Sequence, residues 1–404
     1  MKIKEVNIKN FKSFKELNFN PDHSFGVVNM IYGYNNSGKS NLMKFLHLLF
    51  KKKYGGEIVI LTEDDGTEKR VNRFEDNTQN FWEGQLVDSP FFFTNNDVSK
   101  NVWFSVKIEE VRDSLPDIPE LLALYDDNNS FTIEGEFEYK DYGVSNVNLL
   151  KCFLNGIEIF ANGAYFDSTA ALKGNSLVFN QLLSTFNNSV LLIDSDRYFS
   201  NESDKSKKRE LTPKNFKNWL YQLYLDPASY EQYMDLLSNL ESFKPKAAGS
   251  KPLLTKNLNN YPLNDIDLGF SKSKDILTIM LNKNGRYPIE NYGTGVQQLM
   301  YILAKFISTN PKVLLIEELE LNLSPEYQKE ILNYFKSLTK NTSYNLEQII
   351  FTSHSSYMAK NDKVDRFYAV AINDNGSSKT ALIPRNYAQT YFDDPYAQDT
   401  IPLT

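Results

Sequence analysis

A segment near the amino terminus has the residue types and the spacing that bind phosphate groups. Residues 33–40 read Gly-Tyr-Asn-Asn-Ser-Gly-Lys-Ser and fit the pattern G-x-x-x-x-G-K-[ST] in full. The two glycines let the backbone curl so that successive N–H groups point at phosphate oxygens, and the dipole of a following helix favours negative charge there. In this pattern Lys39 reaches the β- and γ-phosphates of a nucleotide, and Ser40 is a ligand of Mg²⁺. The candidate phosphate contacts are Gly33, Asn35, Asn36, Ser37, Gly38, Lys39, Ser40 and Asn41.

The residues on either side of this segment predict the elements that a phosphate loop needs. Residues 25–32 are an apolar run short enough for a buried strand, and residues 39–50 carry apolar side chains at helical spacing. The order strand, loop, helix favours a phosphate loop over the alternative, an ordinary glycine turn.

Two adjacent carboxylates follow a second apolar run. Residues 313–316 read Val-Leu-Leu-Ile and lead directly into Glu317 and Glu318. A buried strand would deliver both carboxylates at its carboxyl end, where nucleotide sites lie in α/β sheets. We expect Glu317 to hold the Mg²⁺ shell through water, and Glu318 to orient or deprotonate an attacking water. The alternative is a glutamate pair that merely ends a strand.

A second glycine segment and a single histidine complete the set. Residues 292–298 read Tyr-Gly-Thr-Gly-Val-Gln-Gln and open a predicted helix, so they form a second candidate anion site. Since the chain already has a phosphate loop, we expect this segment to contact a nucleotide held by another subunit. The alternative is the glycine-rich cap of an ordinary helix. His354 follows a short predicted strand at 349–352. By itself it would be interpreted as a structural histidine, and its position one helix after Glu318 favours a role in the site.

Composition excludes several other classes of protein. The 404 residues carry a net charge of −7, which argues against a strongly basic nucleic-acid coat. The single cysteine, Cys152, rules out an intramolecular disulfide and a thiolate zinc cluster, and only three histidines are present. No apolar run approaches the roughly 18 residues of a membrane span, and no signal-peptide core is present. We therefore expect a soluble, cytoplasmic protein without a membrane contact.

The pattern of elements predicts an α/β fold interrupted by a long insertion. We expect one lobe over residues 1–55, an insertion of strands and then helices over 56–285, and a second lobe over 286–404. Within the insertion, Asn155-Gly156 between apolar runs indicates a hairpin, and residues 213–243 have a helical pattern. Arg197, after the apolar run 189–193, is interpreted as half of a surface Asp–Arg pair, with a phosphate or partner contact as the alternative. His47 is expected to be packed, and the basic run 205–209 to be a solvated loop.

The order of these motifs resembles that of the OLD/RecF-like ABC-type ATPases, the AAA_15/AAA_21 group. The segment Asn-Phe-Lys-Ser-Phe at 10–14 is similar to the opening of that family and of its SMC and Rad50 kin. The resemblance implies an ABC-type ATPase head that binds ATP and Mg²⁺, with Lys12 near the nucleotide. It also implies that Thr294, Gly295 and Gln297 form the signature that contacts ATP on a partner subunit, and that His354 senses the γ-phosphate. Leu319, Asn322 and Ser324 depart from the family pattern after Walker B, and Gln79 and Gln85 are candidates for the Q-loop glutamine.

The resemblance also implies partners. OLD nucleases carry a nuclease domain of about 100 residues or more after the ATPase, and about 50 residues follow His354 here. We therefore expect an ATPase without a nuclease of its own, similar to the ATPase subunits of two-gene anti-phage systems such as PARIS and Septu. Such a protein would form a homodimer or higher homo-oligomer through head-to-tail sites and act on a separate nuclease effector. The alternatives are a RecF/Rad50-like DNA-repair ATPase that acts on DNA and a binding module that does not hydrolyse ATP.

Overall fold

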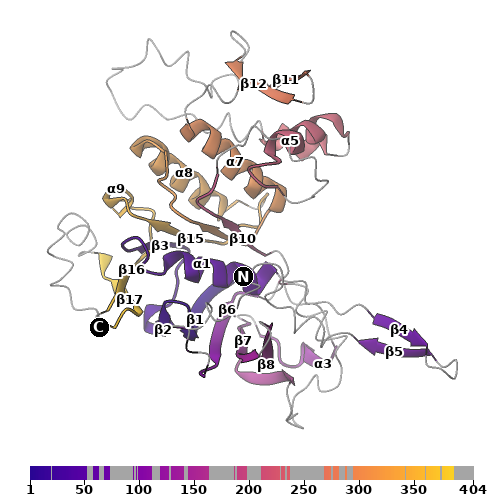
Figure 1. Cartoon of the computed structure of the whole chain (residues 1–404), viewed down its shortest axis with the longest axis vertical. Helices are drawn as coiled ribbons and strands as arrows, with labels where there is room; N and C mark the ends of the chain where they lie inside the picture. Colours follow the sequence, from indigo (N-terminus) through magenta and orange to yellow (C-terminus); the bar gives the residue numbers. More distant parts are fainter. Residues whose placement is uncertain are drawn as a thin grey trace. The chain divides into compact units, whose positions relative to one another are not determined.

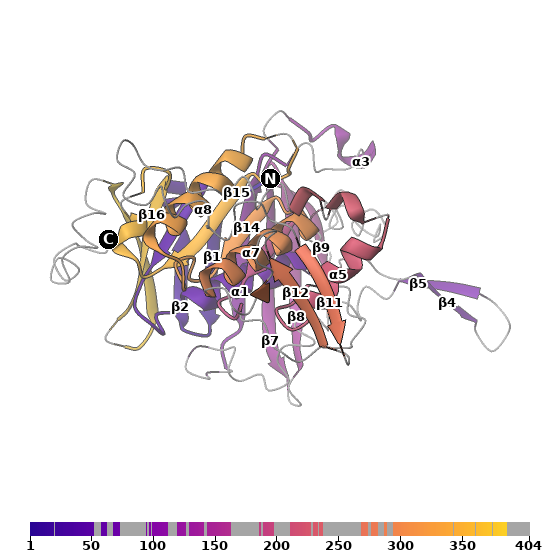
Figure 2. The same cartoon turned by 90° about the horizontal axis from the view of Figure 1, so that it is seen from above.

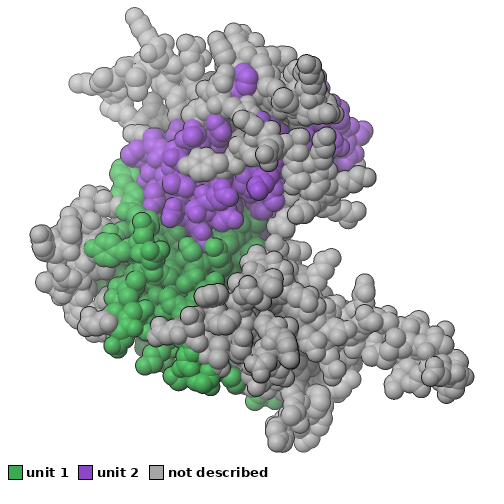
Figure 3. Space-filling view, in the orientation of Figure 1, with its two compact units in different colours: residues 1–192, 312–315, 346–404 green, residues 193–311, 316–345 purple. Residues whose placement is uncertain are grey.

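The computed structural model places most of the residues that carry the sequence motifs. The described residues are 1–19, 21–51, 58–62, 68–72, 94, 97, 99–111, 119–126, 129–140, 144–162, 186, 189–197, 211–227, 229–232, 234–236, 268–273, 276–281, 287–288, 294–341, 343–359, 361–373 and 375–385. They fall into two compact units (Figure 3). The first unit comprises residues 1–192, 312–315 and 346–404, and the second comprises 193–311 and 316–345. Gln79, Gln85, Tyr292, Gly293 and the basic run 205–209 lie outside the described residues.

An antiparallel sheet of six strands forms one layer of the first unit (Figure 1). Its strand order is β2 (Phe14–Phe19), β1 (Lys2–Phe11), β6 (Val102–Glu109), β7 (Phe131–Lys140), β8 (Val144–Leu154) and β9 (Ile157–Asn162). Asn155 and Gly156 join β8 to β9 with φ angles of +51° and +80°. Both angles are left-handed, as a type I′ turn requires, so the predicted hairpin is confirmed.

A mixed sheet contains the strand that leads into the phosphate loop and the strand that leads into Glu317 and Glu318. Its order is β10 (Val190–Ile193), β14 (Val313–Ile316), β15 (Gln348–Ser353), β3 (Val28–Tyr32), β16 (Arg366–Ile372) and β17 (Ser378–Ile383). β3 is parallel to both β15 and β16, and β17 is antiparallel to β16. Every residue of β14 and of β15 is buried, which explains why β14 is apolar throughout and why residues 349–351 of β15 are apolar. The expected mixed α/β fold is confirmed.

Helix α1 (Lys39–Lys51) packs in the core that the two sheets share in the first unit (Figure 1). The ring of Phe45 lies 5.4 Å from that of Phe11 on β1 and 5.4 Å from that of Phe104 on β6, in edge-to-face contacts. Such aromatic pairs contribute about 0.5–1.5 kcal/mol beyond their burial. The helix that begins at the phosphate loop is therefore anchored along its length. His47, also on α1, lies 3.3 Å from the Val190 carbonyl, consistent with a packed side chain.

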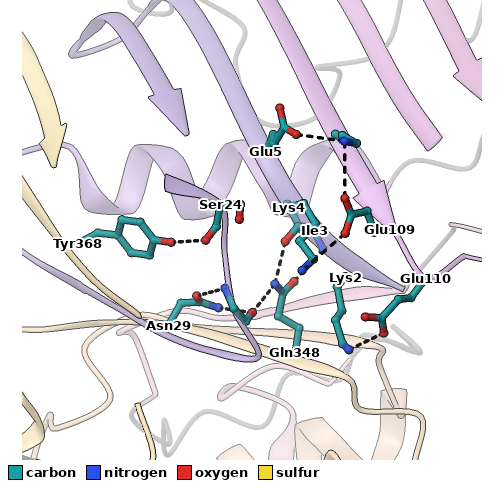
Figure 4. A network of polar contacts seen from close by, with 12 residues as sticks. Lys2, Ile3, Lys4, Glu5, Ser24, Asn29, Glu109, Glu110, Gln348 and Tyr368 are labelled. Atoms are coloured by element: carbon teal, nitrogen blue, oxygen red, sulfur yellow. Dashed lines mark hydrogen bonds and ion pairs between the residues drawn. The ribbon is translucent and has the colours of Figure 1, made fainter. Parts of the chain in front are cut away.

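Gln348 ties the antiparallel sheet to the mixed sheet (Figure 4). Its Nε2 donates 2.8 Å bonds to the carbonyls of Ile3 and Gly26, and its Oε1 accepts the N–H of Ile3 at 2.9 Å. The side chain is 0% exposed. The neighbouring Asn29 accepts the N–H of Gly26 at 2.7 Å, and Tyr368 donates to the Ser24 carbonyl at 2.8 Å. Buried backbone groups at the entry to β3 are thus satisfied by side chains.

The second unit is built from helices and a small sheet. Its helices are α5 (Phe216–Leu225), α7 (Thr294–Thr309) and α8 (Pro325–Leu338), and its sheet has the order β11 (Leu268–Ser273), β12 (Ile276–Leu281), β13 (Tyr287–Pro288). The ring of Phe306 on α7 lies 5.3 Å from that of Phe335 on α8. Figure 2 shows the β11–β12 hairpin next to α5. α5 forms part of the helix expected over 213–243, with further helical residues at 230–232 and 234–236.

The remaining described elements are short. They are the 3-10 turn η1 (Pro21–His23), the helices α3 (Pro119–Leu122) and α9 (Ser356–Ala359), and the hairpin β4 (Ile58–Thr62) with β5 (Glu68–Asn72). β6 to β9 fall inside the segment 56–285, yet β6 pairs directly with β1. None of the described helices is long and apolar enough to cross a membrane. Cys152 is buried and reduced.

Candidate nucleotide site

The predicted phosphate loop follows β3 and ends where α1 begins. Asn36 and Gly38 have φ angles of +66° and +104°, so the loop turns through left-handed conformations. A Cβ at Gly33 would lie 2.3 Å from the Val370 carbonyl oxygen, and one at Gly38 would lie 2.4 Å from Ser13 Oγ. Both positions of the motif therefore exclude a side chain. The predicted strand, loop and helix are present in that order.

Lys39 bends back over the loop that precedes it. Its Nζ donates to the carbonyls of Gly33 and Tyr34 at 2.7 and 2.8 Å, and the residue is only 6% exposed. The positive charge is thus held at the amino end of α1, where the first N–H groups of a helix have no partner within the helix. This combination of cation and helix end suits the phosphates of a nucleotide.

Other residues of the loop also fit a bound phosphate chain. Ser37 Oγ is buried and has no hydrogen-bond partner among the described residues, so it is available to a ligand. Asn35, Asn36 and Ser40 are exposed, so the Ser40 residue is accessible to a metal ion. Asn41, in contrast, donates its side-chain N–H to Ser13 Oγ at 3.1 Å and so also supports the loop.

The turn between β1 and β2 lies against the loop. Lys12 in this turn has a φ of +50°, and its Nζ lies 5.7 Å from the ring centre of Phe11. Burial, and then the neighbouring Lys44 on α1, lower the pKa of the Lys12 ammonium. A half-buried cation beside a second lysine is stabilised by an anion. Lys12 therefore lies near the helix that begins at the phosphate loop, and its contact with the nucleotide stays a prediction.

His354 lies beside the start of the loop. It follows the last residue of β15, Ser353, which pairs with Tyr32, and Gly33 comes directly after Tyr32. The rings of His354 and Tyr32 are 6.5 Å apart. The first unit thus brings His354 and the phosphate loop to the same edge of the sheet, although 320 residues separate the neighbouring strands in the chain.

The second unit holds the two glutamates that follow β14. Glu317 is 3% exposed, and its N–H donates to the Ile193 carbonyl at 2.9 Å. Glu318 is half-buried and has a φ of +46°, which is uncommon for a residue other than glycine. Its carbonyl accepts the N–H of Leu321 at 2.9 Å, so the chain turns sharply after the glutamate pair.

Arg197 corrects the interpretation made from sequence. It is 0% exposed and therefore not half of a surface pair. Its Nε donates to the Asp194 carbonyl at 2.7 Å, and its Nη2 donates to the carbonyls of Glu317 and of Glu318, the latter at 3.1 Å. The surface interpretation was wrong because sequence patterning could not show that the ends of β10 and β14 meet around this side chain.

The signature segment opens α7, as predicted. Thr294 is the first residue of the helix and is exposed, while Gly295 and Gln297 are half-buried. A Cβ at Gly295 would lie 2.6 Å from the carbonyl oxygen of Asn322. The glycine is therefore required by the turn after Glu318, in addition to the phosphate contact expected from the sequence. The steric reason was not visible in the sequence because Asn322 is distant along the chain.

The family model for the AAA ATPase domain matches residues 1–359 of the chain. The chain belongs to this family. Membership of the AAA ATPase domain family supports ATP binding and hydrolysis, and it usually implies Mg²⁺. The phosphate loop described above, with its inward lysine and its two crowded glycines, fits that substrate.

Solved structures of SMC head domains match the chain at low sequence identity. An SMC head bound to the C-terminal winged-helix domain of ScpA is 13% identical, with a TM-score of 0.48, over 96% of this chain and 100% of that chain. The SMC head domain from Thermotoga maritima is 13% identical, with a TM-score of 0.42, over 95% of this chain and 100% of that chain. An SMC head with an extended coiled coil, bound to the C-terminal domain of ScpA derived from Pyrococcus furiosus, is 13% identical, with a TM-score of 0.45, over 97% and 98%. No curated protein sequence matches the chain.

Proposed function

We propose that the protein hydrolyses ATP with Mg²⁺ in a site completed by a second copy of the chain, and that this cycle controls a separate nuclease effector. The observation that carries the ATPase part is the phosphate loop, in which Lys39 Nζ is held by the carbonyls of Gly33 and Tyr34 at the start of α1. Charge, helix end and loop shape all favour a triphosphate there.

Each residue of this site has a separate proposed task. Lys39 and the loop N–H groups bind the β- and γ-phosphates, and Lys12 adds positive charge beside α1. Glu318 accepts a proton from the attacking water or orients it, and general bases of this kind contribute about 10²–10⁴-fold to a rate. His354 senses the γ-phosphate from the end of β15. A Mg²⁺ ion held through Ser40, and by Glu317 through water, would neutralise charge on the phosphate oxygens.

The second copy is proposed because the chain has two helix ends suited to anions. One is the start of α1 at the phosphate loop, and the other is the start of α7 at Thr294 and Gly295. Two such ends in one chain are explained if Thr294, Gly295 and Gln297 contact a nucleotide held by the phosphate loop of a partner subunit. ATP would then join two copies head to tail, and hydrolysis would separate them.

The effector part of the proposal rests on the resemblance to the OLD/RecF-like group and on composition. The sequence motifs supply one catalytic set, for ATP, and the net charge of −7 favours a protein over nucleic acid as the main partner. The proposed setting is anti-phage defence with a nuclease on a separate chain. The reading frame next to the gene for this protein tests the effector part of the proposal directly. A nuclease that copurifies with the ATPase when the two are co-expressed supports it, and a replication or repair operon favours the DNA-acting alternative.

The ATPase part is tested by phosphate release and by equilibrium binding of ATP. Lys39→Ala should weaken ATP binding at least about 10-fold, because one charged contact is worth about 1.5–3 kcal/mol. Glu318→Gln should keep ATP binding and lower turnover by about 100-fold or more. The exposed Lys379 and the half-buried Glu330 provide the controls Lys379→Ala and Glu330→Gln, which should leave both quantities unchanged. Unchanged turnover in Glu318→Gln would contradict the proposal.

A further inference from the structure

The side chain of Arg197 joins the ends of two strands through backbone carbonyls. β10 and β14 run in the same direction, since Lys312 N–H bonds to the Ser189 carbonyl at their start and Glu317 N–H bonds to the Ile193 carbonyl at their end. Arg197 lies just beyond that end. Its guanidinium donates to the carbonyls of Asp194, Glu317 and Glu318. The planar guanidinium of arginine carries five N–H donors in a fixed arrangement, so it can donate to several acceptors at once.

Burial of this charge needs a physical reason. A guanidinium taken out of water loses several kcal/mol of hydration, by order of magnitude, which only good hydrogen bonds and opposite charges offset. Here the carbonyls are supplemented by the carboxylates of Asp194, Glu317, Glu318 and Glu320, which favour the charged form. Burial still lowers the pKa of Arg197 to about 10, so the group stays protonated at neutral pH. An apolar side chain could fill this volume without such a loss of hydration.

The backbone that Arg197 holds is strained at one residue. Glu318 has a φ of +46°, and a left-handed conformation at a residue other than glycine costs on the order of 1–3 kcal/mol. Such a conformation persists when the surroundings fix it. Two donors fix the peptide that follows Glu318, because its carbonyl accepts both Arg197 Nη2 at 3.1 Å and the Leu321 N–H at 2.9 Å. That backbone sets the direction in which the Glu318 side chain leaves the turn.

We propose that Arg197 is a positioning residue for Glu318, holding its backbone in the left-handed turn that aims the carboxylate at the attacking water. This inference rests on the proposed role of Glu318 in hydrolysis. Arg197 does not contact the nucleotide itself in this account and acts through the two carbonyls. A displacement of a catalytic group by about 1 Å can lower a rate by about 100-fold. Loss of Arg197 should therefore lower kcat and leave ATP binding largely intact.

The test combines Arg197→Lys with Glu318→Gln. Lysine keeps the charge but cannot hold the two glutamate carbonyls in the fixed geometry of a guanidinium. We expect Arg197→Lys to lower kcat about 10- to 100-fold, with ATP affinity within about 3-fold of the wild type. In a protein that already carries Glu318→Gln, the same change should have no further effect on turnover. This loss of effect separates a positioning role from a structural one, because damage to the fold would lower residual turnover and binding in both backgrounds.

A matched control comes from Lys305 on α7. It is another buried cation of the second unit, and its Nζ donates to the carbonyl of Leu211 at 2.5 Å. Lys305→Met should lower stability without a selective loss of kcat.

An Arg197→Lys protein with unchanged kcat would overturn the inference, and so would one that fails to fold while Lys305→Met folds. If wild-type protein has no ATP turnover, the proposed function fails. If the wild type hydrolyses ATP and Glu318→Gln does not, but Arg197→Lys keeps the wild-type kcat, then the proposed function stands and only the inference about Arg197 is overturned.

Discussion

Ser378 Oγ donates a hydrogen bond of 2.5 Å to the carbonyl of Ser37, although 341 residues separate the two in the chain. The N–H of Ser378 also donates to the Ser13 carbonyl at 2.7 Å. The first residue of β17 therefore joins the phosphate loop to the turn between β1 and β2. β17 lies beyond the residues that match the AAA ATPase domain, which end at 359. The strand whose first residue bonds to the phosphate loop therefore comes from the part of the chain after residue 359.

Ser378→Ala should weaken ATP binding and leave kcat nearly unchanged. The alanine keeps the backbone bond to Ser13 and loses the bond to the loop, and a single hydrogen bond contributes about 0.5–1.5 kcal/mol, or about 2- to 12-fold in affinity. Equilibrium titration with ATP measures the change. Ser377→Ala is the control, because Ser377 is also buried and its bond to Asn373 is made by the backbone N–H. Equal affinities in the two variants would refute the role of Ser378.

Gly38→Ala should weaken ATP binding. The φ of +104° is unfavourable for alanine, and the new Cβ would lie 2.4 Å from Ser13 Oγ and 2.7 Å from Ser378 Oγ. Overpacking of this kind costs about 1–3 kcal/mol, which corresponds to about 5- to 160-fold in affinity if the loop shifts. Gly156→Ala is the matched control. Gly156 has a φ of +80° but nothing within 4 Å of a Cβ, so binding should be unchanged.

Gly135→Ala should lower the free energy of unfolding by about 1–3 kcal/mol. Gly135 on β7 pairs with Phe104 on β6, and a Cβ there would lie 2.3 Å from the phenylalanine ring. The aromatic ring covers the glycine and has no room to withdraw, since it also contacts Phe45. Urea unfolding measures the loss. The double variant Gly135→Ala with Phe104→Leu should lose less than the sum of the two single variants, and strict additivity would contradict this packing.

Gln348→Leu should be more destabilising than Gln328→Leu. Gln348 makes three hydrogen bonds, to both backbone polar groups of Ile3 and to the Gly26 carbonyl (Figure 4), and so joins segments that are distant in the chain, whereas Gln328 donates to the carbonyl of Leu323, five residues before it, at 2.9 Å. A buried backbone group left without its partner costs about 1–3 kcal/mol. We expect a difference of about 2–4 kcal/mol between the variants in urea unfolding. Similar losses in both would show that the backbone of Ile3 and Gly26 finds other partners.

The elements that follow from local pattern were predictable. The strand before Gly33, the helix α1 after it, the β8–β9 hairpin at Asn155-Gly156 and the helices α7 and α8 each have a signal within the segment itself. These signals arise because the apolar spacing and the turn chemistry of a segment reflect the surface that it buries. The phosphate loop was predictable for the same reason, since its backbone conformation depends on glycines within it.

Contacts between distant segments were not predictable. The pairing of β1 with β6, the bond from Ser378 to Ser37 and the burial of Arg197 depend on how strands meet in the sheet, and single-sequence pattern does not show this. Arg197 illustrates the limit well. Its neighbours Asp194 and Asp196 suggested a solvated pair. One of the three carbonyls that Arg197 binds does belong to Asp194, but the other two belong to residues 120 and 121 positions later.

The central claim is that two copies share each ATP site, and complementation tests it most directly. Lys39→Ala removes the cation of the phosphate loop in one copy, and Gly295→Asp places a charged side chain in the signature segment of the other. Each variant alone should therefore be inactive. Mixed in equal amounts, they form heterodimers in which one of the two sites is intact, and phosphate release should recover to about a quarter of the wild-type rate. No recovery on mixing, together with a wild-type rate per subunit that does not depend on protein concentration, would contradict the shared site.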